Sequence, residues 1–385
     1  MMNADNIEPE QSLDAILAEA LDRPMTAEQQ LAQVERVLES LRRVGQLGRG
    51  DAAELDILMS VGQTYLKFSH LGRALETLES AMQIAESLGE TSVRAKILRS
   101  IGRVYRSSGR WEEALDHLRQ SETAYRDMDD ASGLAGVLLN IGSVEAERSR
   151  HAESEAAYTE ALELARSSGN DRTVVAALNN LAILQTIQGN QDEAIDRYRE
   201  CVRLYEALED TAGVARSVLN MGMAFADKRE WSSAMSCYEK AYHLAEKDGE
   251  LTLIANIHLN RAELLLELGD SAIAAPACAK ALDIYKKTDD RLGEADAYRL
   301  LGMVFTRREQ WTTAEKLFEQ SIDLNRRFEH RLGEAEAYRD RGRMFVALQT
   351  PDQGRSDFEQ ALEIFGDLGA ASDAARVTSL IESLA

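Results

Sequence analysis

The stretch RLGEADAYRLLGMVF at residues 291–305 recurs as RLGEAEAYRDRGRMF at residues 331–345. The two copies begin 40 residues apart, and the same interval relates weaker matches along most of the chain. Self-similarity at a constant period of this length is typical of proteins built from one repeated supersecondary unit. The repeat is therefore expected to decide the fold.

Small residues mark one position of the repeat in all eight copies. The residues at this position are Gly62, Gly102, Gly142, Ala182, Gly222, Ala262, Gly302 and Gly342. Twelve residues later comes a second small residue, four further on a bulky one in most copies, and three beyond that a small one again. Small residues one turn apart let two helices approach closely, and the large residue fills the space at their crossing. The pattern predicts eight antiparallel helix pairs.

The composition favours helix throughout. The 385 residues include only four prolines, and Ala, Leu, Glu, Arg and Gln are abundant. These residues are good helix formers, and no window shows the alternating Val, Ile and Thr that mark strands. Because a single helix pair cannot bury its apolar stripe, neighbouring pairs must stack. The expected fold class is all-α, a solenoid of antiparallel helix pairs.

Three segments make up the predicted domain organisation. Residues 51–370 hold the eight repeats, residues 1–50 read as a degenerate helical hairpin that caps the array, and residues 371–385 as a C-terminal capping helix. Terminal repeats with a polar outer face are needed to seal such an array. Within it, Pro276 falls inside the second helix of the sixth pair and is expected to kink or break that helix.

The small–Gly–aromatic, Ala, aromatic, Ala signature at residues 58–81 and in each later copy resembles the tetratricopeptide repeat. Its period of 40 is similar to the longer repeats of kinesin light chain and of bacterial signalling proteins. This resemblance implies a right-handed superhelix whose concave surface is lined by the first helix of each pair. It also implies a binding scaffold, a class that says little about the particular function.

The charge and the ends of the chain exclude several classes of partner. A net charge of −22 argues against nucleic acid and against an anionic membrane surface, since both repel an acidic protein. No stretch reaches the roughly 18 apolar residues needed to cross a bilayer, and the N-terminus lacks the apolar core of a signal peptide. We expect a cytoplasmic protein that binds neither nucleic acid nor membrane.

Motifs for catalysis, metals and cofactors were sought, and none was found. The six histidines are scattered and never stand at i, i+4, and the three cysteines have unrelated spacings. The chain is therefore expected to be neither an enzyme nor a protein with a metal or cofactor. An enzyme would require the folded groove to gather a histidine and carboxylates that the linear sequence keeps apart.

Asparagine recurs at one position of four consecutive repeats, two residues before the small residue: Asn140, Asn180, Asn220 and Asn260. A carboxamide offers two donors and two acceptors, so it can bind a backbone N–H and C=O whatever the side chains of the ligand. A row of such groups would suit an extended peptide. The alternative is that each Asn bonds the neighbouring repeat and fixes the stacking. Asn179 belongs to another column and is predicted to be a separate contact in the groove.

Arginines and apolar residues complete the predicted site. The arginines form two groups, Arg99, Arg103 and Arg106 in one repeat and Arg299, Arg339 and Arg343 in the last two. Guanidinium groups match carboxylates, so these residues could anchor a ligand; alternatively they pair with Glu263, Glu267, Asp227 or Glu147. The apolar residues predicted to face the groove are Leu139, Ile183, Met223, Leu259 and Met303.

The predicted function is a non-enzymatic scaffold that holds an extended or helical segment of a partner protein or peptide in its groove. Two alternatives stay open. One is a peptide-responsive sensor subunit that acts on a separate output protein. The other is a self-assembling scaffold whose groove is filled by a second copy, so a homo-oligomer is possible. The residues do not identify the partner, the pathway or the oligomeric state.

Overall fold

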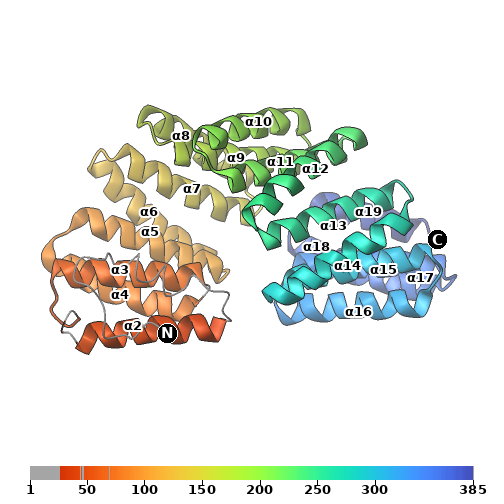
Figure 1. Cartoon of the computed structure of the whole chain (residues 1–385), viewed down its shortest axis with the longest axis horizontal. Coiled ribbons are helices and arrows are strands. Elements are labelled where there is room, and N and C mark those ends of the chain that lie inside the picture. Colours follow the sequence, from red (N-terminus) through yellow and green to blue (C-terminus); the bar gives the residue numbers. More distant parts are fainter. Residues whose placement is uncertain (1–26, 44, 46, 69, 385) are drawn as a thin grey trace. The chain divides into compact units, whose positions relative to one another are not determined.

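The computed structural model describes residues 27–43, 45, 47–68 and 70–384 (Figure 1). Eighteen α-helices and no strands make up the regular structure of these residues. The helices are α2 (Ala27–Arg43), α3 (Ala52–Lys67), α4 (Leu71–Leu88), α5 (Thr91–Ser107), α6 (Trp111–Asp127), α7 (Ala131–Glu147), α8 (His151–Ser167), α9 (Asp171–Gln188), α10 (Gln191–Ala207), α11 (Thr211–Asp227), α12 (Trp231–Asp248), α13 (Leu251–Glu267), α14 (Ser271–Thr288), α15 (Arg291–Arg307), α16 (Trp311–Arg327), α17 (Arg331–Ala347), α18 (Pro351–Asp367) and α19 (Ala371–Glu382).

The eight repeats form the helix pairs from α3–α4 to α17–α18. In each pair we call the first helix leading and the second trailing; the leading helices carry odd numbers. The chain divides into two compact units within α9, so that unit 1 ends at Asn180 and unit 2 begins at Leu181. Each unit is an all-α stack of helix pairs, as the repeat predicted.

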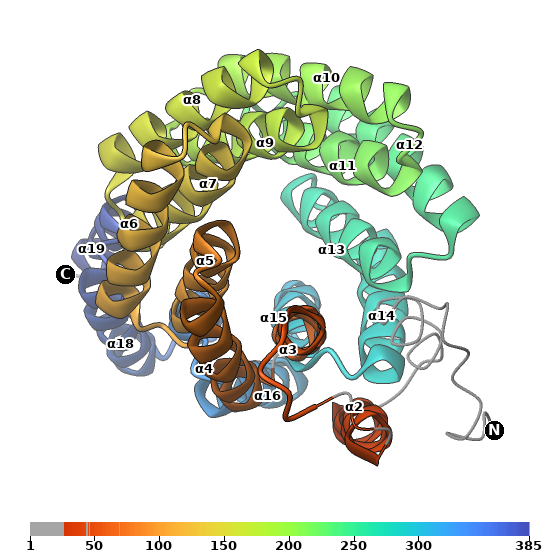
Figure 2. The same ribbon diagram turned by 90° about the vertical axis from the view of Figure 1, so that its left-hand side faces the viewer.

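Within each unit the leading helices lie closer together than the trailing ones. In unit 1, α5 contacts both α3 and α7, and in unit 2 each leading helix from α11 to α17 contacts the next leading helix. Figure 2 shows the same two layers, with α5 and α7 on the inner side of unit 1 and α6 and α8 on its outer side. The inner side of each unit is therefore lined by leading helices.

Glycine at the repeat's small position permits the close crossing of a pair. A Cβ added at Gly142 would lie 2.6 Å from the ring of Tyr158, and one added at Gly302 would lie 2.8 Å from the ring of Phe318. Phe318 is fully buried. Because these distances are shorter than any ordinary contact, the bulky residue of the trailing helix occupies the space that a side chain would need.

A second packing rule applies at six of the seven junctions between one pair and the next; the seventh has Asn325 with Gly333. Where the trailing helix ends with a tyrosine, the residue eight positions later is glycine: Tyr125 with Gly133, Tyr205 with Gly213, and Tyr285 with Gly293. A Cβ at these glycines would lie 2.2 to 2.3 Å from the tyrosine ring. Where the trailing helix instead ends with alanine, the later residue is larger: Ala85 with Val93, Ala165 with Thr173, and Ala245 with Leu253. A bulky ring is thus followed by glycine, and a small alanine by a larger residue.

Acidic and amide side chains cap several leading helices. The side chains of Asp130, Asp210 and Asp290 accept hydrogen bonds from the backbone N–H three residues later, at 2.9, 2.7 and 2.9 Å. Asn170 accepts one in the same way at 3.2 Å. These caps fix where these four leading helices begin.

The expected break at Pro276 does not occur, since α14 runs without interruption from Ser271 to Thr288. Pro276 lies on an exposed face of that helix. Because proline has no N–H, the carbonyl one turn earlier loses its donor within the helix. That carbonyl can accept a hydrogen bond from water instead, so the helix continues past the proline.

The ends of the array are described in part. Val34, Leu38 and Leu41 of α2 are buried in the core that α3 and α4 share, and Val377 of α19 is buried against α17 and α18. The first helix predicted for residues 1–50 lies outside the described residues. Within the part of the chain that the structure covers, no helix combines the length and apolar character that a membrane crossing needs.

Candidate functional site

Three arginines of α5 share one side of that helix in unit 1. Arg99, Arg103 and Arg106 follow one another at spacings of four and three residues. Arg106 Nε lies 3.6 Å from Glu147 Oε1 on α7, one of the internal pairings left open by the sequence. For Arg99 and Arg103, no carboxylate among the described residues lies within 4.0 Å. Two of the three guanidinium groups therefore have no counter-ion among the residues that the structure describes.

Arg99 and Asn140 meet at Gly136 of the next leading helix. A Cβ added at Gly136 would lie 2.3 Å from Arg99 Nη1, so the guanidinium rests against bare backbone. The Gly136 carbonyl accepts a hydrogen bond from Asn140 Nδ2 at 2.9 Å. Desolvation, together with the charges of Arg99 and Arg106, lowers the pKa of Arg103. The structure thus brings Arg99 of α5 against α7, one turn before Asn140.

The asparagines of the column are half-buried on the leading helices. Asn260 Nδ2 donates to the Asn256 carbonyl at 2.9 Å, the same bond within one helix that Asn140 makes. Neither bond reaches a neighbouring repeat. The alternative role, in which each Asn bonds the next repeat and fixes the stacking, is therefore not seen in these two bonds. A carboxamide has a second N–H and an acceptor oxygen, so a bond of this kind leaves capacity for a ligand. Asn179 and Asn180 of α9 and Asn220 of α11 are half-buried as well.

The five apolar residues predicted for the groove differ in exposure. Leu259 is buried in the core of α13 to α15, so it does not face a groove, and Leu139 is half-buried. The remaining three share one position of the repeat. Ile183 and Met223 are 39% and 42% exposed on α9 and α11 of unit 2. Met303 is half-buried, packed against the core of α13 to α15 and against Phe318 and Met344. All three occupy the repeat position that Arg103 holds in unit 1. Ile183 and Met223 therefore offer exposed apolar surface on leading helices, whereas Met303 mostly supports the fold.

The arginines near the C-terminus converge on one buried carboxylate. Asp340, 3% exposed, accepts hydrogen bonds from Arg299 Nη1 at 2.8 Å, Arg339 Nε at 3.0 Å and Arg343 Nη1 at 3.2 Å. Burial opposes the charge of Asp340, but Arg339 and Arg299 outweigh it and lower its pKa. Asp340 therefore already binds all three arginines of the C-terminal group, Arg299, Arg339 and Arg343.

Arg299 has further acidic neighbours. It is 8% exposed, and its Nη2 lies 3.5 Å from Glu336 and 3.9 Å from Glu263. Pairing with Glu263 was the alternative that the sequence left open. The pairing of Arg299 with Glu336 and Asp340 was not predicted from the sequence. The repeat offered a signal, because Asp340 places an acid at the position that asparagine holds in four other repeats.

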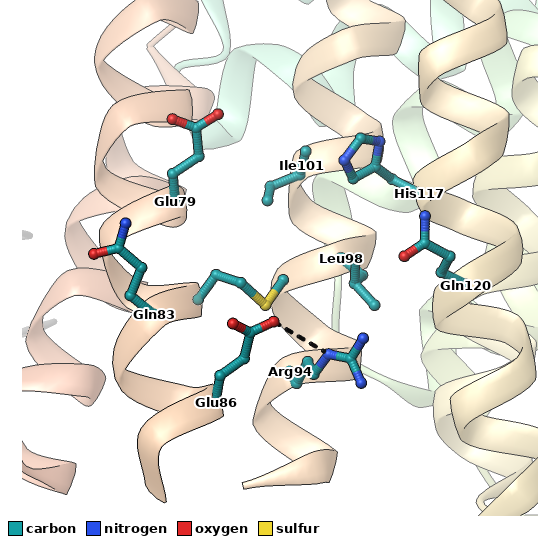
Figure 3. Close-up of a pocket in the computed structure, with 9 residues that line it drawn as sticks. Glu79, Gln83, Glu86, Arg94, Leu98, Ile101, His117 and Gln120 are labelled. Carbon is teal, nitrogen blue, oxygen red and sulfur yellow. Dashed lines mark ion pairs between the residues drawn. The ribbon is translucent and has the colours of Figure 1, made fainter. Parts of the chain in front are cut away.

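A cavity of about 390 Å³ lies between α4, α5 and α6 of unit 1 (Figure 3). Its lining residues are Glu79, Met82, Gln83, Glu86, Arg94, Leu98, Ile101, His117 and Gln120. Arg94 pairs with Glu86 across it at 3.8 Å. None of the residues predicted for ligand binding lines it, because Leu98 and Ile101 lie on a different side of α5 from Arg99 and Arg103.

Comparisons with known proteins agree with this architecture. The family model described as tetratricopeptide repeat matches residues 55–127, 133–207, 253–327 and 295–367. These matches cover more than half of the chain, which therefore belongs to the tetratricopeptide repeat family. A search of curated protein sequences gave no significant match.

Several solved structures share the fold at low sequence identity. The apo form of the quorum sensor NprR from B. thuringiensis is 18% identical with a TM-score of 0.63, over 91% of this chain and 97% of that one. The Rap protein complexed with competence and sporulation factor is 14% identical with a TM-score of 0.66, over 93% and 99% of the two chains. NprR in complex with its cognate peptide NprX is 18% identical with a TM-score of 0.53, over 89% and 99%. At these identities the likeness concerns the fold.

Proposed function

We propose that the chain is a non-enzymatic, peptide-binding regulatory protein of the cytoplasm. Its ligand would be an extended peptide segment that lies on leading helices. The asparagine carboxamides of the protein would hydrogen-bond the backbone of the peptide, and the exposed apolar residues would contact the side chains of the peptide. The proposed contact residues form one set in each unit, and each set is considered by itself: Asn140, Asn179, Asn180, Arg99, Arg103 and Arg106 in unit 1, and Asn220, Asn260, Ile183 and Met223 in unit 2. Arg299, Arg339, Arg343 and Met303 are proposed only as supports of these helices.

The observation that carries the proposal is that Arg99 of α5 lies against Gly136 of α7, whose carbonyl accepts the hydrogen bond of Asn140. Hydrogen-bonding groups with spare capacity line up there on rigid helices, as a backbone-reading site requires. Support also comes from NprR and the Rap protein, whose structures hold a cognate peptide and a competence factor respectively. A regulatory role follows if peptide binding alters the contacts that the array makes with an output protein.

Replacing Asn140 with Ala tests this proposal directly. We measure binding of a synthetic library of linear heptapeptides by affinity selection and mass spectrometry, then titrate the enriched peptides. Loss of one or two backbone hydrogen bonds should weaken binding roughly fivefold to tenfold.

The matched control is Asn190→Ala, which changes an exposed turn residue whose side chain makes no capping bond. The control should bind as the wild type does. If Asn140→Ala binds normally but is less stable to urea, the column has a structural role and the proposed contact is wrong.

A further inference from the structure

Two positions of the repeat, one on a trailing helix and one on the next leading helix, carry matched residue types at six of the seven junctions between pairs. In unit 2, Glu239 is followed 22 residues later by Arg261, and Glu319 by Arg341. Where the first position is not acidic, the second is apolar: Arg119 with Ile141, Thr159 with Leu181, Arg199 with Met221, and Ala279 with Leu301. Glutamate on the trailing helix and arginine on the leading helix therefore occur together.

Glu79 of unit 1 breaks this match, because the residue 22 positions later is Ile101. The other exceptions involve the helices at the two ends of the array, α2 and α19: Glu39 with Val61, and Glu359 with Ile381. Glu79 is exposed on α4, and no cation lies within 4.0 Å of it among the residues that the structure describes. Unit 1 thus keeps the acid of the match and lacks the arginine.

In unit 2 the arginine of the match lies between acids of two trailing helices. Nε and Nη2 of Arg341 donate to the two carboxylate oxygens of Asp357 on α18, at 2.7 and 2.8 Å. The guanidinium also lies over the ring of Tyr338, 5.4 Å from its centroid. Burial opposes the charge of this guanidinium, but Asp357, Tyr338 and Glu319 of α16 outweigh it and raise the pKa of the arginine. The protein therefore supplies its own cation here.

The cavity between α4, α5 and α6, which we call the α4–α6 cavity, occupies the corresponding place in unit 1 (Figure 3). Its lining includes Glu79, Leu98, Ile101 and His117, which hold the repeat positions of Glu319, Tyr338, Arg341 and Asp357. Glu79 and His117 lie on opposite walls, with Ile101 between them. Because leucine and isoleucine replace a tyrosine and an arginine, about 390 Å³ is open where unit 2 holds a ring and a guanidinium.

The walls of the α4–α6 cavity suit a guanidinium group. The charge of Arg94 is balanced by Glu86 at 3.8 Å, so the carboxylate of Glu79 supplies the negative charge that remains. His117 Nδ1 lies 2.8 Å from the Glu113 carbonyl oxygen, which can only accept, so Nδ1 carries the proton of the neutral ring and Nε2 is an acceptor. Apolar and carboxamide side chains complete the lining: Met82, Leu98, Ile101, Gln83 and Gln120.

We infer that the α4–α6 cavity binds the side chain of an arginine from a partner protein. The guanidinium of the partner would take the place that Arg341 has in unit 2, with Glu79 as its counter-ion and its methylene carbons on the apolar lining. A volume of about 390 Å³ falls near the lower end of the range for ligand pockets, roughly 300–1,000 Å³, which suits one side chain with its flanking backbone. The cavity contains none of the residues proposed to bind the peptide, so this second site goes beyond the proposed function and does not depend on it.

Two peptide libraries that differ in one group test the inference on the full chain. Linear nonapeptides without other charged side chains carry a central arginine in one library and citrulline in the other, which has the same length and shape but no charge. Binding is measured by affinity selection and mass spectrometry at about 0.5 M salt, which screens the general attraction between a basic peptide and an acidic protein. The wild type should bind the arginine library at least about tenfold more tightly, and Glu79→Gln should lose this preference.

Glu239→Gln is the matched control, because it removes an exposed charge at the same repeat position, where Arg261 follows in the chain. This variant should keep the preference. The double change Ile101→Arg, His117→Asp copies Arg341 and Asp357, should fill the cavity from within, and should also abolish the preference. Equal binding of the two libraries by the wild type, binding of neither, a preference that survives in Glu79→Gln, or an equal loss in Glu239→Gln overturns the inference.

Discussion

At the scale of single residues, the packing between repeats depends on paired volumes. The ring of Tyr205 fills the space beside Gly213, whereas Ala245 leaves room for Leu253, which is buried in the same core. Cores tolerate exchanges that conserve volume and resist those that add to it. Each glycine of this kind is therefore required by the tyrosine that precedes it.

Gly213→Ala should destabilise the protein by about 1–3 kcal/mol, because the new Cβ would lie 2.3 Å from the Tyr205 ring. Gly72→Ala is the control: nothing lies within 4 Å of a Cβ there, so the same change within a helix should stabilise by up to about 1 kcal/mol. Urea denaturation followed by circular dichroism measures both. The double change Tyr205→Ala, Gly213→Leu copies the Ala245–Leu253 junction and should recover part of the loss; no recovery would contradict paired volumes.

The buried carboxylate of Asp340 gives a second prediction at this scale. Asp340→Asn leaves Arg299 and Arg339 without their principal counter-ion, and removing one partner of a buried pair typically costs about 3–5 kcal/mol. Since the pKa of Asp340 is lowered on folding, its stabilisation is present above about pH 4 and is lost as pH falls through the folded value.

The difference in unfolding free energy between wild type and Asp340→Asn should therefore be large at pH 7 and shrink toward pH 3. Denaturation series at several pH values measure it. A difference that does not change with pH would show that the carboxylate is not the source of the effect.

At the scale of helices, the sequence predicted the elements well because one period governs all of them. The small residues, the bulky residues and the acidic caps repeat together, so an error in one copy is corrected by the others. The side chains on the inner face were harder to assign, because their partners depend on residues one repeat away. Arg99 and Arg299 look alike along the chain, yet only Arg299 has Asp340 and Glu336 beside it.

Helix α14 is predicted to gain stability when Pro276 is replaced by alanine. The proline removes one backbone hydrogen bond inside a helix that otherwise continues to Thr288, and it is exposed, so no packing is lost with it. Restoring the bond should raise the free energy of unfolding by about 1–3 kcal/mol. Hydrogen exchange of α14 followed by mass spectrometry should slow; unchanged exchange would mean that the helix already compensates for the proline.

At the scale of the whole chain, the family and the fold followed from the repeat, but the division within α9 did not. The periodic residues continue through Asn180 and Leu181 without a composition shift, so nothing in the sequence marks the boundary. In repeat proteins each unit contacts mainly its neighbours, and stability is a sum of local terms.

We therefore expect a local response to Gly213→Ala. Hydrogen exchange in α10 to α12 should accelerate, while α3 to α7 should exchange as in the wild type. Equal acceleration across both units would indicate that the array unfolds as one cooperative body.

The pairing of tyrosine with glycine and of alanine with a larger residue also limits how such a gene can change in length. From Ala85 to Gly293 the two junction types alternate, so one repeat begins with the larger residue and ends with tyrosine, and the next begins with glycine and ends with alanine. Deleting a single repeat of 40 residues would set a tyrosine against Thr or Leu, or an alanine against glycine. Loss or duplication of 80 residues would restore matched neighbours, so viable recombinants should differ by two repeats at a time.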